Sequence, residues 1–258
     1  MIIYYEPNGV IKIEFEQNRE ILPSDIPPGL TDLYFNINFN KQLKLGILPT
    51  TLKKIVFGDK YNQEIFPNTL PENLEFIQFG KEFKCKVSQY IFPVNLKNIF
   101  FMGNYKHKIH KETFPPNLKY LYFNFNKYEI EDNVLPINLE KIKLGYDYNF
   151  EFKKNTLPKK LKHLELGGIY SHILKEIPKS LKILSICGSK ENELLLNNLP
   201  STIALLILYN LEIPLLNLPT NIKYIKLICY TEETLKLLKI PFGCNVYDRY
   251  NKEIKTLP

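Results

Sequence analysis

Histidine and cysteine are the residue types in this sequence whose chemistry could include metal binding or nucleophilic catalysis. His107 and His110 form an HxxH pair, and Cys85 precedes His107 by 22 residues. In a chain that repeats every 22 residues, Cys85 and His107 would stack on neighbouring turns and could share a metal ion. A zinc site normally needs four convergent ligands. We therefore interpret these residues as solvent-facing loop positions and expect no bound metal or other cofactor.

A cysteine or serine nucleophile would need a positioned base beside it. Cys187 lies at a predicted strand end, and Cys244 replaces a core leucine, so we predict that both are packing residues. His163 and His172 have no evident partner in the sequence. The sequence contains no GxSxG, HExxH, Walker A or GxGxxG motif. We predict that the protein is not an enzyme. Because residues of different repeats could meet in space, catalysis stays open as a third alternative beside protein binding and nucleic-acid binding.

An internal repeat sets the elements that would position any such residue. The phrase LPENLEFIQFG at 70–80 returns as LPTTLKKIVFG at 48–58 and as LPKKLKHLELG at 157–167. Positions in each repeat are numbered from the proline of the phrase, so that plus three is the third residue after it. In eleven repeats, plus three, plus six and plus eight are apolar; the twelfth repeat has only Cys244 and Tyr247 at these positions. The prolines of the register are Pro7, Pro27, Pro49, Pro71, Pro93, Pro115, Pro136, Pro158, Pro178, Pro200, Pro219 and Pro241.

The spacing within each repeat predicts a strand. Positions plus six and plus eight differ by two residues, the period that places side chains on one face. Gly58, Gly80 and Gly167 follow at plus nine, and we interpret each as a turn that needs φ freedom. Asparagine recurs at plus two, as in Asn73 and Asn95, which predicts a structural ladder through bonds to the backbone or between stacked amides.

One such turn cannot enclose a core, whereas stacked turns cover each other's apolar faces. We predict an α/β or mainly β repeat solenoid of about eleven turns of 19–22 residues with one parallel β-sheet. Residues 1–258 would form one repeat domain, with an N-terminal capping repeat at 1–26, regular repeats at 27–227 and a C-terminal cap at 228–258. The segment TEETLKLLK predicts a short helix at about 232–239, with Thr231 as its N-cap.

Composition is that of a globular protein with a packed core, at 45% hydrophobic residues, a formal net charge of +7 and a pI of about 9.0. The apolar runs are far shorter than a membrane span, and MIIYYEPNGV does not look like a secretory signal. Four cysteines without CxxC spacing do not form a disulfide framework. We expect an intracellular monomer, in cytoplasm or nucleus, without membrane contact and with reduced thiols.

The repeated phrase LPxxLKxLxFG resembles the FNIP repeat family, known from social amoebae and from large DNA viruses of amoebae. It is also similar to leucine-rich repeats, whose LxxLxL core is matched by Leu52, Ile55 and Phe57. The resemblance extends from Pro7 to Pro241 and implies a leucine-rich-repeat-like solenoid without enzymatic activity. Some members carry an F-box before the repeats, which would imply a ubiquitin-ligase role. Because the repeat begins by Pro7, we expect no F-box here.

The outward face of the predicted sheet is the best candidate for function. Residues at plus five and plus seven alternate with the buried ones, and aromatic residues gather there on three neighbouring strands. Exposed aromatics are typical binding anchors, although strands favour aromatic residues in any case. We predict a non-catalytic scaffold that binds a protein partner through Tyr34, Phe76, Asn98, Phe100, Tyr120, Tyr122, Lys141 and Lys143.

Lysines at plus four suggest an alternative. They would form a basic edge that is interrupted by Glu75 and Glu140. We interpret the edge as a solvated face, and its alternative role is contact with a nucleic-acid phosphate backbone. The lysines are Lys53, Lys97, Lys119, Lys162, Lys182 and Lys223.

Overall fold

The computed structural model describes residues 2–5, 9 and 11–254. The chain divides into two compact units, which are described separately: unit 1 comprises 1–126 and 134–139, and unit 2 comprises 127–133 and 140–258. Pro7 and Val10, two of the predicted register positions, lie outside the described residues. Residues 1, 6–8 and 10 of the predicted N-terminal cap and 255–258 of the C-terminal cap do so too.

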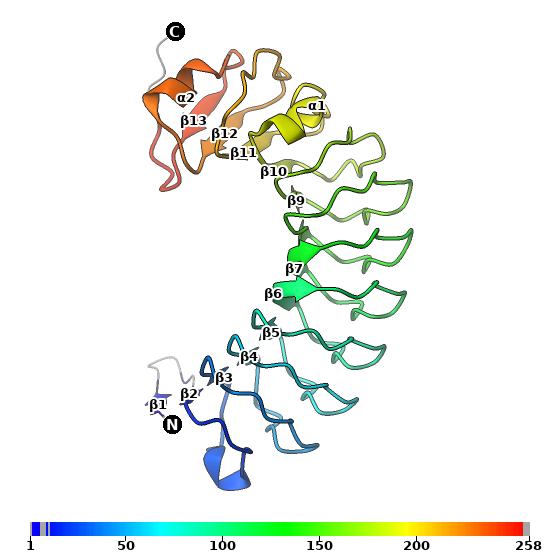
Figure 1. The fold of residues 1–258 in the computed structure, drawn as a ribbon, viewed down its shortest axis with the longest axis vertical. Helices are drawn as coiled ribbons and strands as arrows, with labels where there is room; N and C mark the ends of the chain where they lie inside the picture. The colour runs from blue at the N-terminus through cyan, green and yellow to red at the C-terminus, as the bar shows by residue number, and fades with distance from the viewer. Residues whose placement is uncertain (1, 6–8, 10, 255–258) are drawn as a thin grey trace. The chain divides into compact units, whose positions relative to one another are not determined.

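In unit 1, strands and coil alternate so that the strands lie side by side along one side of the stacked turns (Figure 1). The strands pair in sequence order, and each pair from β2 onward is parallel, whereas β1 runs antiparallel to β2. The elements are β1 (Ile2–Tyr5), β2 (Ile11–Phe15), the 3-10 helix η1 (Pro23–Asp25), β3 (Asp32–Phe35), β4 (Lys54–Val56), β5 (Phe76–Phe79), β6 (Asn98–Tyr105) and β7 (Tyr120–Asn126).

Unit 2 continues the same pattern, and all its paired strands are parallel. Its elements are β8 (Lys141–Lys143), β9 (His163–Glu165), β10 (Ile183–Cys187), η2 (Lys190–Asn192), α1 (Glu193–Leu196), β11 (Leu205–Tyr209), β12 (Tyr224–Leu227), α2 (Glu232–Lys236) and β13 (Asn245–Tyr247). Across both units the chain makes about eleven turns with little helix, which confirms the predicted parallel-sheet repeat solenoid.

The C-terminal turn departs from the expected register. Tyr224 pairs with Asn245 and Ile225 with Val246, so the last repeat is one residue shorter between its proline and its core position. Val246 is 3% exposed, and the prediction that Tyr247 fills that position is wrong. Helix α2 follows Thr231, whose Oγ1 accepts the Thr234 N–H, and it ends at Lys236 rather than 239. The division into caps and regular repeats stays a prediction.

The core consists of the residues at plus three, plus six and plus eight, with a second wall of aromatic side chains at plus twelve. Leu74, Ile77 and Phe79 are fully buried and show the pattern in one repeat. Tyr105, at plus twelve, is also buried, and its hydroxyl accepts the Val87 N–H at 3.1 Å. Tyr148, at the same repeat position, is also buried, and its hydroxyl has no hydrogen-bond partner among the described residues. Burial raises the pKa of Tyr148, which stays neutral inside the stack.

The glycines at plus nine are required for a different reason from the one expected. A Cβ on Gly80 would overlap the carbonyl of Gly58 in the preceding turn, and a Cβ on Gly58 would overlap that of Asn36. Neither glycine has a left-handed φ, so the expectation of φ freedom is wrong, and close approach of backbones is the cause. Left-handed φ occurs instead in the turn before the next proline, at Asn68, Tyr90, Glu112, Asn133 and Asn155.

Asparagine side chains bond neighbouring turns to each other through the backbone. Asn73 Nδ2 donates to the Thr50 carbonyl at 2.9 Å, and Asn95 donates in the same way to Glu72 at 3.1 Å. The predicted ladder is therefore present, and the bonds of Asn73 and Asn95 run from amide to backbone rather than between stacked amides. A second ladder lies at plus thirteen, where Oδ1 of Asn40 accepts the N–H of Asn62 at 3.0 Å.

Candidate functional site

The aromatic residues predicted on the outward sheet face of unit 1 form one continuous column. Phe76 on β5, Phe100 on β6 and Tyr122 on β7 stack with ring centroids 5.1 and 5.6 Å apart. Tyr120 on β7 is 41% exposed, and the other three rings are half-buried by one another. Phe100 and Tyr122 occupy the same repeat position, plus seven, on adjacent parallel strands, whereas Phe76 lies at plus five and stacks diagonally on Phe100.

Lysines extend this column toward the N-terminal strands. The Lys54 ammonium lies 5.0 Å from the Tyr34 ring centroid and 4.9 Å from that of Phe76. Lys12 lies 4.5 Å from the Tyr34 centroid and 5.0 Å from that of Tyr4. Cation–π contacts of this kind hold both ammonium groups against the sheet. The surface is therefore an ordered series of rings and cations over β1–β7.

Asn98 and the two lysines of the predicted site have other surroundings. Asn98 Nδ2 donates to the Glu75 carbonyl at 3.3 Å, which fixes its amide at the start of β6. In unit 2, Glu165 accepts ion pairs from Lys143 at 2.7 Å and from Lys141 at 3.8 Å. The Tyr209 hydroxyl also lies 3.4 Å from the Glu165 carboxylate, which is only 7% exposed. Both lysines are thus held by a carboxylate, and a role for all eight residues in partner binding stays a prediction.

His163 has a partner that the sequence did not reveal. Its Nε2 lies 2.7 Å from Ser185 Oγ on the neighbouring strand of unit 2. Burial lowers the pKa of His163 to about 4, and the Lys141 charge acts in the same direction. Ser185 is 1% exposed, so its hydroxyl is not accessible to a substrate. The pair therefore orders the sheet face rather than forming an accessible nucleophile and base.

The cysteine and histidine of the possible metal pair use their polar atoms within the protein. Cys85 Sγ lies 3.5 Å from Asn62 Oδ1, and His107 Nε2 lies 2.6 Å from the Lys84 carbonyl. Over residues 2–5, 9 and 11–254, no group of three His, Cys, Asp or Glu side chains could hold a metal ion. Burial raises the pKa of the Cys85 and Cys187 thiols, which reduces the fraction of nucleophilic thiolate.

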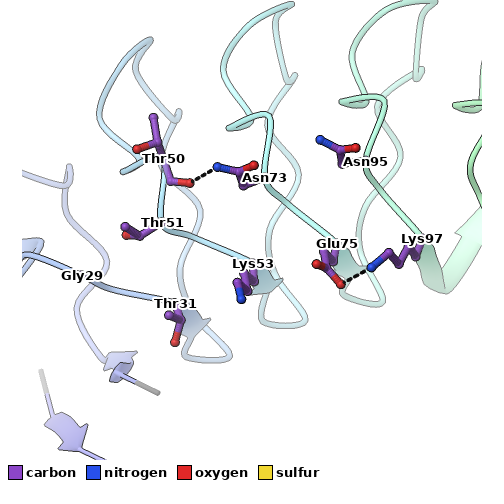
Figure 2. A pocket seen from close by; sticks show the side chains of 9 residues that line it. All are labelled: Gly29, Thr31, Thr50, Thr51, Lys53, Asn73, Glu75, Asn95 and Lys97. Atoms are coloured by element: carbon purple, nitrogen blue, oxygen red, sulfur yellow. Dashed lines mark hydrogen bonds and ion pairs between the residues drawn. The ribbon is translucent and has the colours of Figure 1, made fainter. Parts of the chain in front are cut away.

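A groove of about 360 Å³, lined mainly by residues with polar side chains, lies in unit 1 beside the N-terminal ends of the strands (Figure 2). Positions plus two and plus four of successive repeats line it, joined by Thr50 at plus one. Asn73 bridges to the Thr50 carbonyl, and Lys97 forms an ion pair with Glu75 at 2.7 Å. The lining residues are Gly29, Thr31, Thr50, Thr51, Lys53, Asn73, Glu75, Asn95 and Lys97.

The ion pairs of this edge change the interpretation of the lysines at plus four. Lys97 is neutralised by Glu75 in unit 1, and Lys162 is neutralised by Glu140 at 2.7 Å in unit 2. A continuous row of free cations, as expected for contact with a polyphosphate backbone, is therefore not formed. Lys53 was predicted to belong to this row of lysines, whereas the groove around it was not predicted. The 22-residue spacing of Thr51, Asn73 and Asn95 was the available signal.

Comparison with solved structures supports the fold. The chain resembles CroV588, described as a novel circular LRR protein structure, with a TM-score of 0.50 and 24% identity over 86% of this chain and 40% of that one. YopM from Yersinia enterocolitica WA-314 matches with a TM-score of 0.48 and 22% identity, over 85% of this chain and 45% of that one. The chain thus spans less than half the length of either protein.

A third structure, the leucine-rich repeat-containing protein LegL7 from Legionella pneumophila, matches with a TM-score of 0.48 and 15% identity, over 94% of this chain and 93% of that one. Curated proteins provide no match. In the part of the chain that the structure describes, no helix is long and apolar enough to cross a membrane.

The family model for the FNIP repeat matches this chain three times, at residues 17–60, 61–104 and 125–168. These segments cover just over half of the 258 residues. They include the strands that carry Tyr34, Phe76 and Phe100, together with the asparagine bonds between turns. The resemblance found in the sequence is therefore confirmed, and the chain belongs to the FNIP repeat family.

Proposed function

We propose that this protein is a non-catalytic scaffold that binds a protein partner through the outward face of its sheet. The leucine-rich-repeat-like fold generally mediates protein–protein interaction by presenting an extended, regular surface. The observation that carries the proposal is the stacked column of Phe76, Phe100 and Tyr122, with the more exposed Tyr120 beside it. Aromatic side chains supply large contact areas at low entropic cost and dominate binding energy at interfaces.

The mechanism of binding would be shape complementarity to a surface that is ordered before the partner arrives. The rings are held by their neighbours, so little side-chain entropy is lost on binding. Lys54, which lies against Tyr34, places positive charge at one end of the column, whereas Lys12 beside it is paired with Glu14 at 3.0 Å. Such charges steer the approach and the orientation of a partner more than they add to affinity.

The test is a pull-down of the tagged chain from host-cell lysate, with and without nuclease, followed by mass spectrometry. We expect a protein that remains bound after nuclease treatment. The triple variant Phe100→Ala, Tyr120→Ala, Tyr122→Ala should lose at least tenfold in affinity for that protein, since hot-spot aromatics each contribute about 2 kcal/mol or more. Its melt followed by circular dichroism should change little, because these rings lie outside the core.

Phe66→Ala with Val94→Ala is the matched control, since both side chains are exposed apolar groups of unit 1 outside the sheet face. This double variant should bind as the wild type does. Unchanged binding by the triple variant would refute the assignment of the aromatic column. Loss of every bound protein with nuclease, with an affinity that falls steeply as salt rises, would support the nucleic-acid alternative instead.

A further inference from the structure

The groove of unit 1 contains a cation whose charge the protein does not neutralise. Lys53 is exposed at the start of β4, and no described carboxylate forms an ion pair with its ammonium group. Lys97, at the equivalent position two repeats later, is paired with Glu75 across the same groove. The groove therefore carries one uncompensated positive charge beside a neutral ion pair (Figure 2).

The other hydrogen-bonding groups of the groove divide into those that already have a partner within the protein and those that have none. The hydroxyls of Thr31 and Thr51 already donate to the carbonyls of Ile11 and Leu30. The amides of Asn73 and Asn95 donate along the backbone, which leaves their Oδ1 atoms as acceptors. The Thr50 hydroxyl has no hydrogen-bond partner among the described residues.

The groups without a partner in the groove are therefore the Lys53 ammonium, the Thr50 hydroxyl and the amide oxygens of Asn73 and Asn95. A carboxylate complements the ammonium group, and peptide N–H groups complement the amide oxygens. A phosphate polymer fits less well, because Glu75 occupies the groove and because the next lysine, Lys97, is already neutralised.

We propose that the groove binds an acidic side chain, Asp or Glu, of an extended peptide segment, with Lys53 as its cation. This proposal rests on the proposed protein-binding function and specifies the chemistry of the partner. The aromatic column lies on the outward face of the same strands, since Lys54, next to Lys53, contacts Phe76. A partner could then contact the column while its acidic segment extends into the groove.

The test uses a fluorescein-labelled octapeptide of alternating glutamate and serine, followed by fluorescence anisotropy at low salt. A peptide with glutamine in place of glutamate and an eight-residue oligothymidine are the comparison probes. We expect the glutamate peptide to bind best. Lys53→Gln should weaken its binding three- to tenfold, and Glu75→Gln should strengthen it about threefold because it releases Lys97. Lys182→Gln, at the same repeat position in unit 2, should leave it unchanged.

Equal binding of the glutamate peptide by wild type and Lys53→Gln overturns the proposal, as does weaker binding by Glu75→Gln. Preference for oligothymidine overturns it in favour of nucleic acid. If the glutamate peptide fails while the aromatic triple variant still loses its captured protein, only the groove assignment is wrong. If the triple variant keeps that protein while the lysine effects hold, the sheet-face function is wrong and the groove assignment stands.

None of the substituted residues is fully buried, and an unchanged melt confirms that each variant folds.

Discussion

The two units build the same turn around different cores. At plus eight, unit 1 has a stack of phenylalanines, in which Phe57, Phe79 and Phe101 follow one another at 5.6 and 5.2 Å between centroids. Unit 2 has aliphatic residues at this position, such as Leu166 and Leu208, which are equally buried. Position plus eight therefore accepts either stacked rings or aliphatic side chains, provided that successive turns carry the same kind of side chain and pack closely.

The outward faces differ as well, and there no core constraint explains the difference. Unit 1 presents rings and cations, whereas unit 2 presents Glu165 with its two lysines and the His163–Ser185 pair. Beyond them, Leu205 and Ile207 on β11 are half-buried aliphatic residues. Because stacking of turns does not dictate these outward side chains, their difference is the better indicator of which unit contacts a partner.

The largest effect should come from a feature that both units share. Gly80→Ala in unit 1 and Gly167→Ala in unit 2 should each lower the free energy of unfolding by about 3 kcal/mol, because the added Cβ meets the backbone of the preceding turn. Urea unfolding measures the change. Gly46→Asn is the control, since Gly46 has a left-handed φ of 73° that Asn tolerates and has open space around it. A large effect in one unit alone would show that the turns are not equivalent.

Exchanging the two kinds of core should destabilise both units. Phe79→Leu removes ring contacts with Phe57 and Phe101 and should cost about 2 kcal/mol. Leu166→Phe places a ring in an aliphatic column and should cost about 1–3 kcal/mol through overpacking. Urea midpoints give both values. If Leu166→Phe stabilised the protein, the aliphatic column would be underpacked and the comparison between the units would need revision.

Acid should weaken unit 2 through His163. The folded pKa of about 4 lies below the ordinary value of 6.5, so between these values the unfolded chain binds the proton more readily. The histidine thus lowers stability as pH falls through this window, by roughly 2 kcal/mol between pH 7 and pH 5. His163→Gln, which keeps a hydrogen-bonding group near Ser185, should flatten the dependence of the urea midpoint on pH. An unchanged slope in this variant would assign the acid sensitivity to other groups.

The smallest effect concerns the left-handed turn residues. Tyr90 and Glu112 have φ values of 64° and 66°, whereas Asn155 takes the equivalent position in unit 2 at 69°. Asparagine tolerates this conformation better than other side chains. Tyr90→Asn and Glu112→Asn should each stabilise unit 1 by about 0.5–1 kcal/mol, and Asn155→Tyr should destabilise unit 2 by a similar amount. Thermal melts of the three variants test the signs, and stabilisation by Asn155→Tyr would contradict the explanation.

The sequence was sufficient for the fold because the repeat averages out local ambiguity. Eleven copies of the apolar spacing predicted the buried apolar residues of these repeats, such as Leu33 and Ile225, but not Val246 on β13 or the buried polar residues Glu165 and Ser185. It also predicted that the outward aromatic residues at plus five and plus seven would gather on neighbouring strands, whereas the diagonal stacking of Phe76 at plus five on Phe100 at plus seven follows from the structure alone.

Other features depended on distances that the spacing does not contain. The need for Gly80 arises from the path of the preceding turn, and the partner of His163, Ser185, lies diagonally opposite it on the neighbouring strand. The groove around Lys53 became visible only when the bonds within the protein showed which charges were already neutralised.

The second asparagine ladder has a consequence for how such chains change length. Asn18 accepts the N–H of Asn40, Asn40 accepts that of Asn62, and Asn62 accepts that of Lys84, so every junction between these turns uses the same bond. Removal of one whole 22-residue turn would bring together two surfaces that already match. Duplication would do the same. Recombination within the gene can therefore lengthen or shorten the protein by whole turns without disturbing the junctions that remain.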